Sequence, residues 1–159
     1  MRRHLIALLI ALPTTPLAAQ APPAALPAAT AADIAALAEK LAASIKPGQA
    51  LLAQPLLGFG PYRAVMEYRQ AGAPAAVHYT QAEIFQVVAG AGQLVTGGTL
   101  DGPRTANAPS ATETASGISG GSSRRLAVGD MVVVPAGVPH WIPSVEGRLV
   151  LISTKVPMP

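Results

Sequence analysis

The chain has 159 residues, no cysteine and a formal net charge of +3. Without cysteine it has neither disulfide bonds nor thiolate nucleophiles, and a bound metal would need imidazole, carboxylate or water as ligands. The positive charge does not indicate a nucleic-acid surface, because the basic residues form no stripe. The densest basic pair, Arg124-Arg125, is interpreted as a solvated strand start. We therefore expect no nucleic-acid partner.

Residues 1–20 have the pattern of a secretory signal peptide. The basic pair Arg2-Arg3 precedes an apolar run at 5–12 and small residues at 17–21. The apolar run is shorter than the roughly 20 residues of a membrane span, so no membrane attachment is expected after cleavage. Cleavage removes two of the eleven basic residues and none of the eight acidic ones, which leaves a net charge of +1. We expect a periplasmic or secreted protein whose remaining residues, about 140, form one compact domain.

A flexible leader and one helix are expected next. Residues 21–29 are rich in proline and alanine and predict an extended linker. Thr30 followed by Asp33 indicates a helix N-cap, and the region 30–48 ends at a Lys-Pro-Gly sequence. Apolar residues recur every three or four positions and share one helix face: Ile34, Leu37, Leu41 and Ile45. We expect this face to pack on the following domain, with a partner surface as the alternative.

Residues 49–159 change to a β pattern, with short runs of branched and aromatic residues separated by glycine and proline. Strands are expected at 50–57, 62–69, 75–79, 83–88, 93–96, 124–127, 131–134, 140–142 and 148–155. Turns are expected at 58–61 and at 90–92, the second as a hairpin. The polar stretch 101–123 is interpreted as a loop, either a tolerated insertion or a lid. The pattern favours an all-β sandwich or barrel.

Two short motifs contain both histidines that remain after cleavage. The first, at 78–90, reads H-x4-E-x6-G, begins at His78 and contains Glu83. The second, at 129–140, reads G-x5-P-x-G-x2-H and ends at His140. Proline fixes φ and glycine permits a tight turn, so the second motif predicts a rigid loop that returns its histidine toward the domain.

Both motifs resemble those of the cupin superfamily, over roughly Tyr62 to Val156. The second motif matches without gaps, and the first matches the later part of H-x-H-x4-E-x6-G. The resemblance implies a double-stranded β-helix, or jelly-roll, barrel with one N-terminal helix. In cupins these histidine and glutamate side chains line the mouth of the barrel and often hold a metal.

The sequence departs from the family pattern at one ligand position, where Ala76 replaces the first histidine. The remaining set is His78, Glu83 and His140, and two imidazoles with one carboxylate match the ligands of non-haem iron sites. The resemblance therefore implies a divalent transition metal, Fe, Mn, Ni or Zn, with Glu83 as candidate catalytic acid or base. The loss of one ligand leaves open a barrel that binds no metal.

Two functions remain open from the sequence. The first is a metal-dependent protein acting on a small molecule, as an oxygenase, isomerase or lyase, and the second is a metal-free, non-catalytic binding barrel. Candidate pocket residues are polar or aromatic positions on expected strands: Tyr68, Phe85, Gln93 and Trp141, with Tyr79 as a further possibility. Lys155 is interpreted as a solvated strand end, with a pocket charge as the alternative. A homodimer is expected, because cupin barrels commonly pair.

Overall fold

The computed structural model describes residues 27–107 and 111–158, and within them one helix and eleven strands. The expected signal peptide and most of the leader lie outside the described residues. The helix is α1 (Ala31–Ser44). The strands are β1 (Leu51–Phe59), β2 (Tyr62–Arg69), β3 (Ala75–His78), β4 (Gln81–Thr96), β5 (Thr99–Asp101), β6 (Thr105–Asn107), β7 (Thr112–Ala115), β8 (Gly117–Ser119), β9 (Ser122–Ala127), β10 (Met131–Val134) and β11 (His140–Pro157). Across the described part of the chain, no helix has the length and apolar character needed to cross a membrane.

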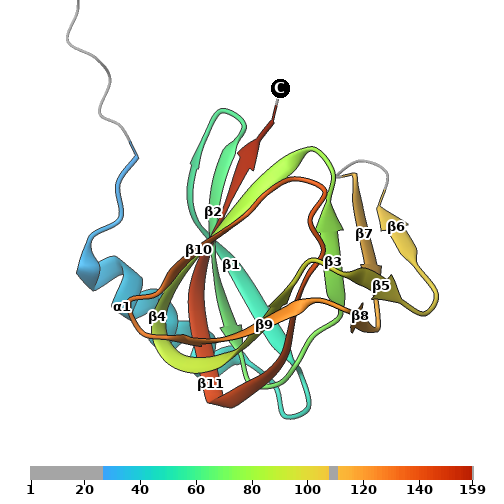
Figure 1. The fold of residues 1–159 in the computed structure, drawn as a ribbon. Helices are drawn as coiled ribbons and strands as arrows, with labels where there is room; N and C mark the ends of the chain where they lie inside the picture. Colours follow the sequence, from blue (N-terminus) through green and yellow to red (C-terminus); the bar gives the residue numbers. More distant parts are fainter. Residues whose placement is uncertain (1–26, 108–110, 159) are drawn as a thin grey trace, which may run out of the picture.

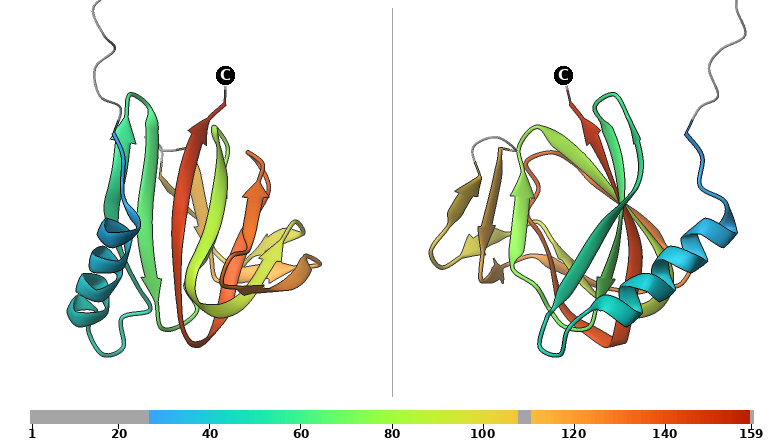
Figure 2. Two further views of the ribbon diagram at one scale, coloured as in Figure 1. Left: turned by 90° about the vertical axis from the view of Figure 1, so that its left-hand side faces the viewer. Right: turned by 180° about the vertical axis from the view of Figure 1, so that it is seen from behind.

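Nine of the eleven described strands form one curled antiparallel sheet in which β11 is central. β11 pairs with β2, β3 and β4, and β4 pairs in turn with β9 and β10. Beyond these strands, β1 extends the sheet next to β2, and β7 and β6 extend it next to β3. The sheet closes on itself as a barrel, and β5 and β8 form a small separate sheet (Figures 1 and 2). The expected all-β barrel with one N-terminal helix is confirmed.

Helix α1 packs on the outside of the barrel against β1 and β2 (Figure 2). It begins with the expected cap, because the Thr30 hydroxyl accepts a bond from the Asp33 backbone amide and the Asp33 carboxylate accepts one from the Thr30 amide. Leu41 is 0% exposed and packs with Met66, Val150 and other apolar residues of the barrel wall. The helix face is therefore covered by its own barrel. The homodimer stays a prediction.

Strand alternation divides β11 between two cores. Leu149 and Leu151 point into the barrel and pack with Phe85 and other residues of the inner wall. Val150 and Ile152 point outward and pack beneath the helix. Both faces of β11 are therefore buried from Leu149 to Ser153, which explains the apolar run in this part of the strand.

The expected hairpin at 90–92 is wrong, because β4 runs without interruption from Gln81 to Thr96. Gly90 pairs with Leu149 of β11 and has a φ of +73°. A Cβ there would lie 2.0 Å from the carbonyl oxygen of Arg148. The glycine thus permits close approach of two backbones where the strand bends, not a reversal of the chain. The strands expected at 140–142 and 148–155 are likewise one continuous strand, β11.

The expected loop at 101–123 is also wrong over most of its length. It contains β6, β7 and β8, and β7 pairs antiparallel with β3, the strand that carries His78. Three of its threonines, Thr105, Thr112 and Thr114, lie in β6 and β7, and threonine suits strands as well as loops. The segment consequently forms part of the wall around the site.

Candidate metal centre

Three strands bring the two sequence motifs together. His78 ends β3, Glu83 lies near the start of β4, and His140 begins β11. The turn before His140 is tied directly to the first motif, because the backbone N–H of Gly137 donates to the His78 carbonyl oxygen at 2.8 Å. Gly137 has a φ of +77°, a conformation that favours glycine. The second motif therefore works as expected, returning its histidine to the end of β3.

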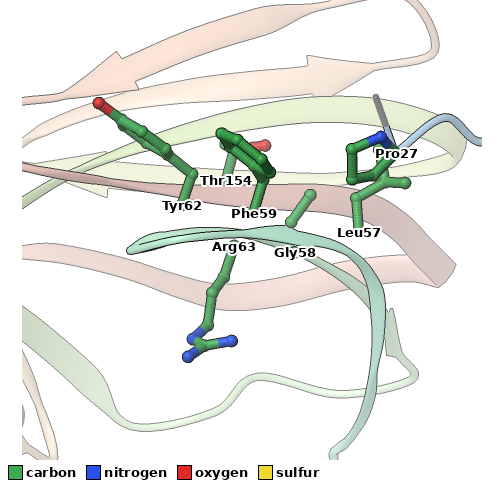
Figure 3. A pocket seen from close by; sticks show the side chains of 8 residues that line it. Pro27, Leu57, Gly58, Phe59, Tyr62, Arg63 and Thr154 are labelled. Carbon is green, nitrogen blue, oxygen red and sulfur yellow. The ribbon is translucent and has the colours of Figure 1, made fainter. Parts of the chain in front are cut away.

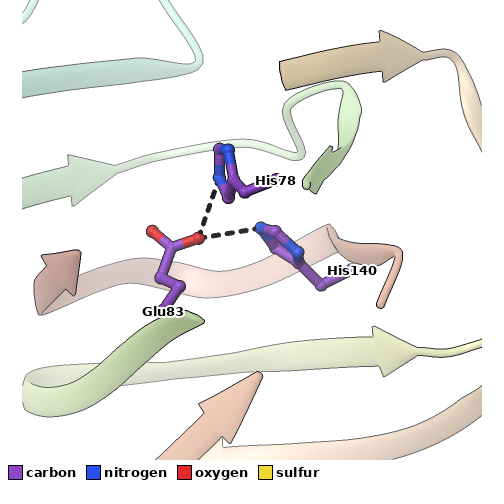
Figure 4. Close-up of side chains that lie close together, drawn as sticks. All are labelled: His78, Glu83 and His140. Atoms are coloured by element: carbon purple, nitrogen blue, oxygen red, sulfur yellow. Dashed lines mark ion pairs between the residues drawn. The ribbon is translucent and has the colours of Figure 1, made fainter. Parts of the chain in front are cut away.

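The three side chains converge on one oxygen atom. Oε2 of Glu83 lies 3.1 Å from Nε2 of His78 and 3.0 Å from Nε2 of His140 (Figure 4). One ligand atom from each residue lies within 4.8 Å of the other two. Glu83 is only 2% exposed, His140 is buried and His78 is partly buried. The predicted metal ligands are thus brought together away from bulk water.

Hydrogen bonds fix how the imidazoles face Glu83. Nδ1 of His78 lies 2.8 Å from the Thr112 hydroxyl, and Nε2 of His78 lies 2.6 Å from Nζ of Lys155. Since an ammonium group only donates, His78 Nε2 accepts and holds a lone pair toward the site. Nδ1 of His140 lies 3.4 Å from the Val138 carbonyl oxygen, which only accepts, so in the neutral ring Nε2 again holds a lone pair. Both rings present the nitrogen that a metal would need.

Glu83 uses its two oxygens differently. Oε1 accepts a short hydrogen bond from the Ser153 hydroxyl and lies 2.6 Å from Nζ of Lys155. Oε2, by contrast, is a fully buried atom that makes no hydrogen bond of ordinary geometry with the described residues. Burial by itself raises the pKa of the Glu83 carboxyl, but contacts with His140 and His78 and the charge of Lys155 outweigh it and hold this pKa well below 4.5. Glu83 is therefore an anion whose Oε2 needs positive charge beside it, from protons on the rings or from a metal ion.

A cavity of about 300 Å³ opens beside this cluster. Phe85 and Trp141, two of the candidate pocket residues, line it, and the Phe85 ring is edge-on to His140 at 5.7 Å between centroids. The indole N–H of Trp141 donates to the Ala73 carbonyl oxygen at 2.8 Å, which fixes the ring in the cavity wall. Ala76 also lines the cavity and is paired with His140, so the position of the missing ligand faces the site.

Three other expected pocket residues lie elsewhere. Tyr68 packs beneath the helix, on the opposite face of β2 from the cavity. Gln93 accepts a hydrogen bond from the exposed Ser123 hydroxyl at 3.3 Å. Tyr79 is half exposed and donates to Glu113 at 2.9 Å. None of the three lines the cavity within the part of the chain that the structure describes.

The sequence did not single out several residues that the cavity does contain. Glu67 and Arg69 flank Tyr68 and face inward, and Thr112 and Thr114 come from the segment interpreted as a loop. Lys155 is not a solvated strand end, because its side chain is 22% exposed and contacts Glu83. A signal for it exists in hindsight, since alternation along β11 places Lys155 on the same face as the buried Ser153, Leu151 and Leu149.

A second cavity, of about 410 Å³, lies at the tip of the β1–β2 hairpin (Figure 3). It is mainly apolar, with the exposed rings of Phe59 and Tyr62 at its edge. Arg63 is the one charged side chain among the described residues that line it. It therefore lacks the grouped acid, base or ligand residues found beside Glu83.

A family model described as Cupin matches residues 51–157, which include every strand of the barrel wall and all three converging side chains. The chain belongs to the cupin family. The resemblance of the two motifs is thus confirmed, although this cupin has alanine at one of the usual histidine positions. Comparison with curated proteins gave no match.

Solved structures of similar fold share few residues with this cupin. KdgF from Halomonas sp. is 19% identical, with a TM-score of 0.51, and the match covers 73% of this chain and 86% of KdgF. The cupin domain of Schizosaccharomyces pombe Cnp3 is 16% identical, with a TM-score of 0.50 and coverages of 73% and 66%. The Fe(II) form of HppE is 13% identical, with a TM-score of 0.51 and coverages of 68% and 52%. At such identities the likeness shows the fold alone.

Proposed function

We propose that this cupin binds one divalent transition metal through His78, Glu83 and His140, and that the metal centre acts on a small molecule in the adjoining cavity. The observation that carries the proposal is the buried Oε2 of Glu83, which lies about 3 Å from two imidazole nitrogens. In their neutral form both nitrogens hold a lone pair, although the one on His78 accepts from Lys155 when no metal is bound. Three electron-pair donors so close together in a buried site repel one another unless ring protons or a metal cation lie between them, and one metal ion would serve all three.

The residues around the triad suit this role. Thr112 bonds Nδ1 of His78 and orients its ring, as partners outside the ligand set do in metal sites. Ser153 and Lys155 engage Oε1 of Glu83, which leaves Oε2 for the metal. With both oxygens occupied, we infer that Glu83 is a ligand and not a general base. When bound, the metal would supply Lewis-acid chemistry toward a substrate oxygen and keep coordination positions open for that substrate.

Metal content and titration test the proposal. We expect protein from its native compartment to contain a stoichiometric transition metal, and Mn(II), Fe(II) or Zn(II) to bind the metal-free protein in calorimetry. His140→Ala should weaken binding by about 100-fold or more, since even residues outside the ligand set contribute 10–100-fold. His78→Ala should do the same, and the double variant should be little weaker than either single one.

Thr114→Val is the matched control, because Thr114 lines the same cavity but is outside the triad. Its metal affinity should stay within a few-fold of that of the unchanged protein. Small and additive losses in the histidine variants, or a control that loses as much as they do, would contradict a shared metal site.

One observation favours a second candidate, the metal-free binding barrel. Lys155 already places a positive charge beside Glu83 and His78, which is partial compensation without a metal. This candidate predicts a native preparation without metal and no heat of binding with Mn(II). The same histidine variants would then weaken small-molecule binding by about 1–3 kcal/mol each, the cost of a lost buried hydrogen-bond partner.

A further inference from the structure

Four charged side chains line the cavity, and they form two ion pairs. Nη2 of Arg69 lies 2.7 Å from Oε2 of Glu67, and Nζ of Lys155 lies 2.6 Å from Oε1 of Glu83. All four side chains are less than one quarter exposed. Each pair is neutral, so the charges of the described cavity wall are balanced.

A divalent metal at the triad would upset this balance by two positive charges. Glu83 is the sole carboxylate of the triad, and Glu67 is already engaged by both Nε and Nη2 of Arg69. The described wall offers no further carboxylate that could approach the metal. An uncompensated charge of +2 is unfavourable in a cavity whose charged side chains are so little exposed to water. An anion that entered from solvent would compensate part of this charge.

Lys155 contacts the atom that the metal would need. Its Nζ lies 2.6 Å from Nε2 of His78, and that single lone pair serves either the ammonium or a metal. Metal binding must therefore release Lys155 from His78. Pairing of Lys155 with Glu83 across β11 and β4 keeps its backbone beside the site, while its four-carbon stem lets the ammonium turn into the cavity.

We propose that the small molecule carries a carboxylate, and that the ammonium of Lys155 binds this carboxylate once the metal has displaced it from His78. The inference rests on the proposed metal site and adds the substrate class. Lys155 then has two opposite roles, competing with the metal and attracting the anion. A residue that was merely structural would not affect the two affinities in opposite directions.

The test uses Co(II), whose visible absorption reports on ligands at the metal, with acetate as probe and acetamide as its neutral analogue. We expect acetate to change the spectrum of the Co(II)-loaded protein saturably, and acetamide to have little effect. Lys155→Met should bind Co(II) roughly tenfold more tightly and acetate roughly tenfold more weakly, because it removes one positive charge beside a buried site. Lys155→Arg should retain acetate binding, since it keeps the charge.

Arg63→Met is the matched control, because Arg63 is paired with Lys155 on the neighbouring strand but is exposed and outside this cavity. It should leave both affinities unchanged. If Co(II) binds but Lys155→Met leaves acetate affinity unchanged, or acetamide binds as well as acetate, the carboxylate proposal is overturned and the metal site stands. If the unchanged protein binds no Co(II), both proposals are overturned.

Discussion

Ala76 is the position where this chain departs from the family motif, and the structure shows that the departure lies at the site. Ala76 lines the cavity and its backbone is paired with that of His140. A side chain at this position extends toward the triad from the same strand as His78. Three ligands are enough for a catalytic metal site, so the missing fourth does not by itself exclude one.

Ala76→His is expected to tighten metal binding by about tenfold, because a fourth imidazole adds a ligand on the correct face. Competitive titration with Zn(II) against a chelating dye measures the change. Ala106→His, which adds a histidine at an exposed position of β6, is the control and should bring no gain. Equal affinities for the three proteins would show that a side chain at position 76 does not reach the metal.

The helix contributes to stability from outside the barrel, at a distance from the site. Leu41→Ala should lower the free energy of unfolding by about 2–5 kcal/mol, because it leaves a cavity between α1 and β2. Urea denaturation measures the loss, and Lys40→Ala on the exposed face is the control, expected within about 0.5 kcal/mol of the unchanged protein. Metal affinity should be unaffected by either change. A loss below 0.5 kcal/mol for Leu41→Ala would contradict the packing of Leu41 against the barrel wall.

Local sequence patterns predicted some elements well and others poorly. Strands β2 and β10 have the expected bounds, because Pro61 precedes β2 and β10 is a short valine run between Gly129 and Pro135. Continuity of β4 through Gly90 depends on pairing with the distant β11, which no local pattern contains. Glycine is typical both of turns and of bends within a strand. The sequence alone therefore favoured a turn at Gly90, where the structure has a strand bend.

The prediction of which face of β2 lines the cavity was wrong, and the reason is physical. Tyr68 was expected in the pocket, yet its face is covered by the helix, and the charged Glu67 and Arg69 face the barrel interior. The usual alternation with apolar residues inward is reversed at this end of the barrel, because the interior is the polar site. The triad itself was predictable, since its three residues belong to sequence motifs. Those motifs are recognised by their spacing, without knowing which face of each strand points into the barrel.

At the scale of the whole molecule, the buried carboxylate couples stability to pH. Burial raises the pKa of Glu83, but the two histidines and Lys155 outweigh it, so the folded-state pKa lies below the unfolded value of 4.5. A lowered pKa contributes stability that is fully present above about pH 4.5 and is lost as the pH falls below it. The folded state is thus expected to weaken progressively under acid.

Glu83→Gln should remove part of this dependence. We expect the variant to be about 1–3 kcal/mol less stable at neutral pH, where the charged contacts are lost, and to lose less stability than the unchanged protein below about pH 4.5. Urea denaturation of the metal-free proteins at several pH values provides the comparison. Glu39→Gln, on the exposed face of the helix, should keep the original pH dependence. Parallel pH profiles for the Glu83 variant and the unchanged protein would contradict the assignment.

The position of β11 has a consequence for when the site comes into being. This strand carries His140, Ser153 and Lys155, and it is also the strand that joins β2, β3 and β4 into one barrel. His78 and Glu83 are synthesised long before their partners, and contacts so distant in sequence form slowly. A partly synthesised chain therefore holds two of the three proposed ligands without the turn and strand that fix the third. Under the proposed metal site, binding by the full triad must wait until the barrel is complete, so a metal held by all three residues would report that folding is finished.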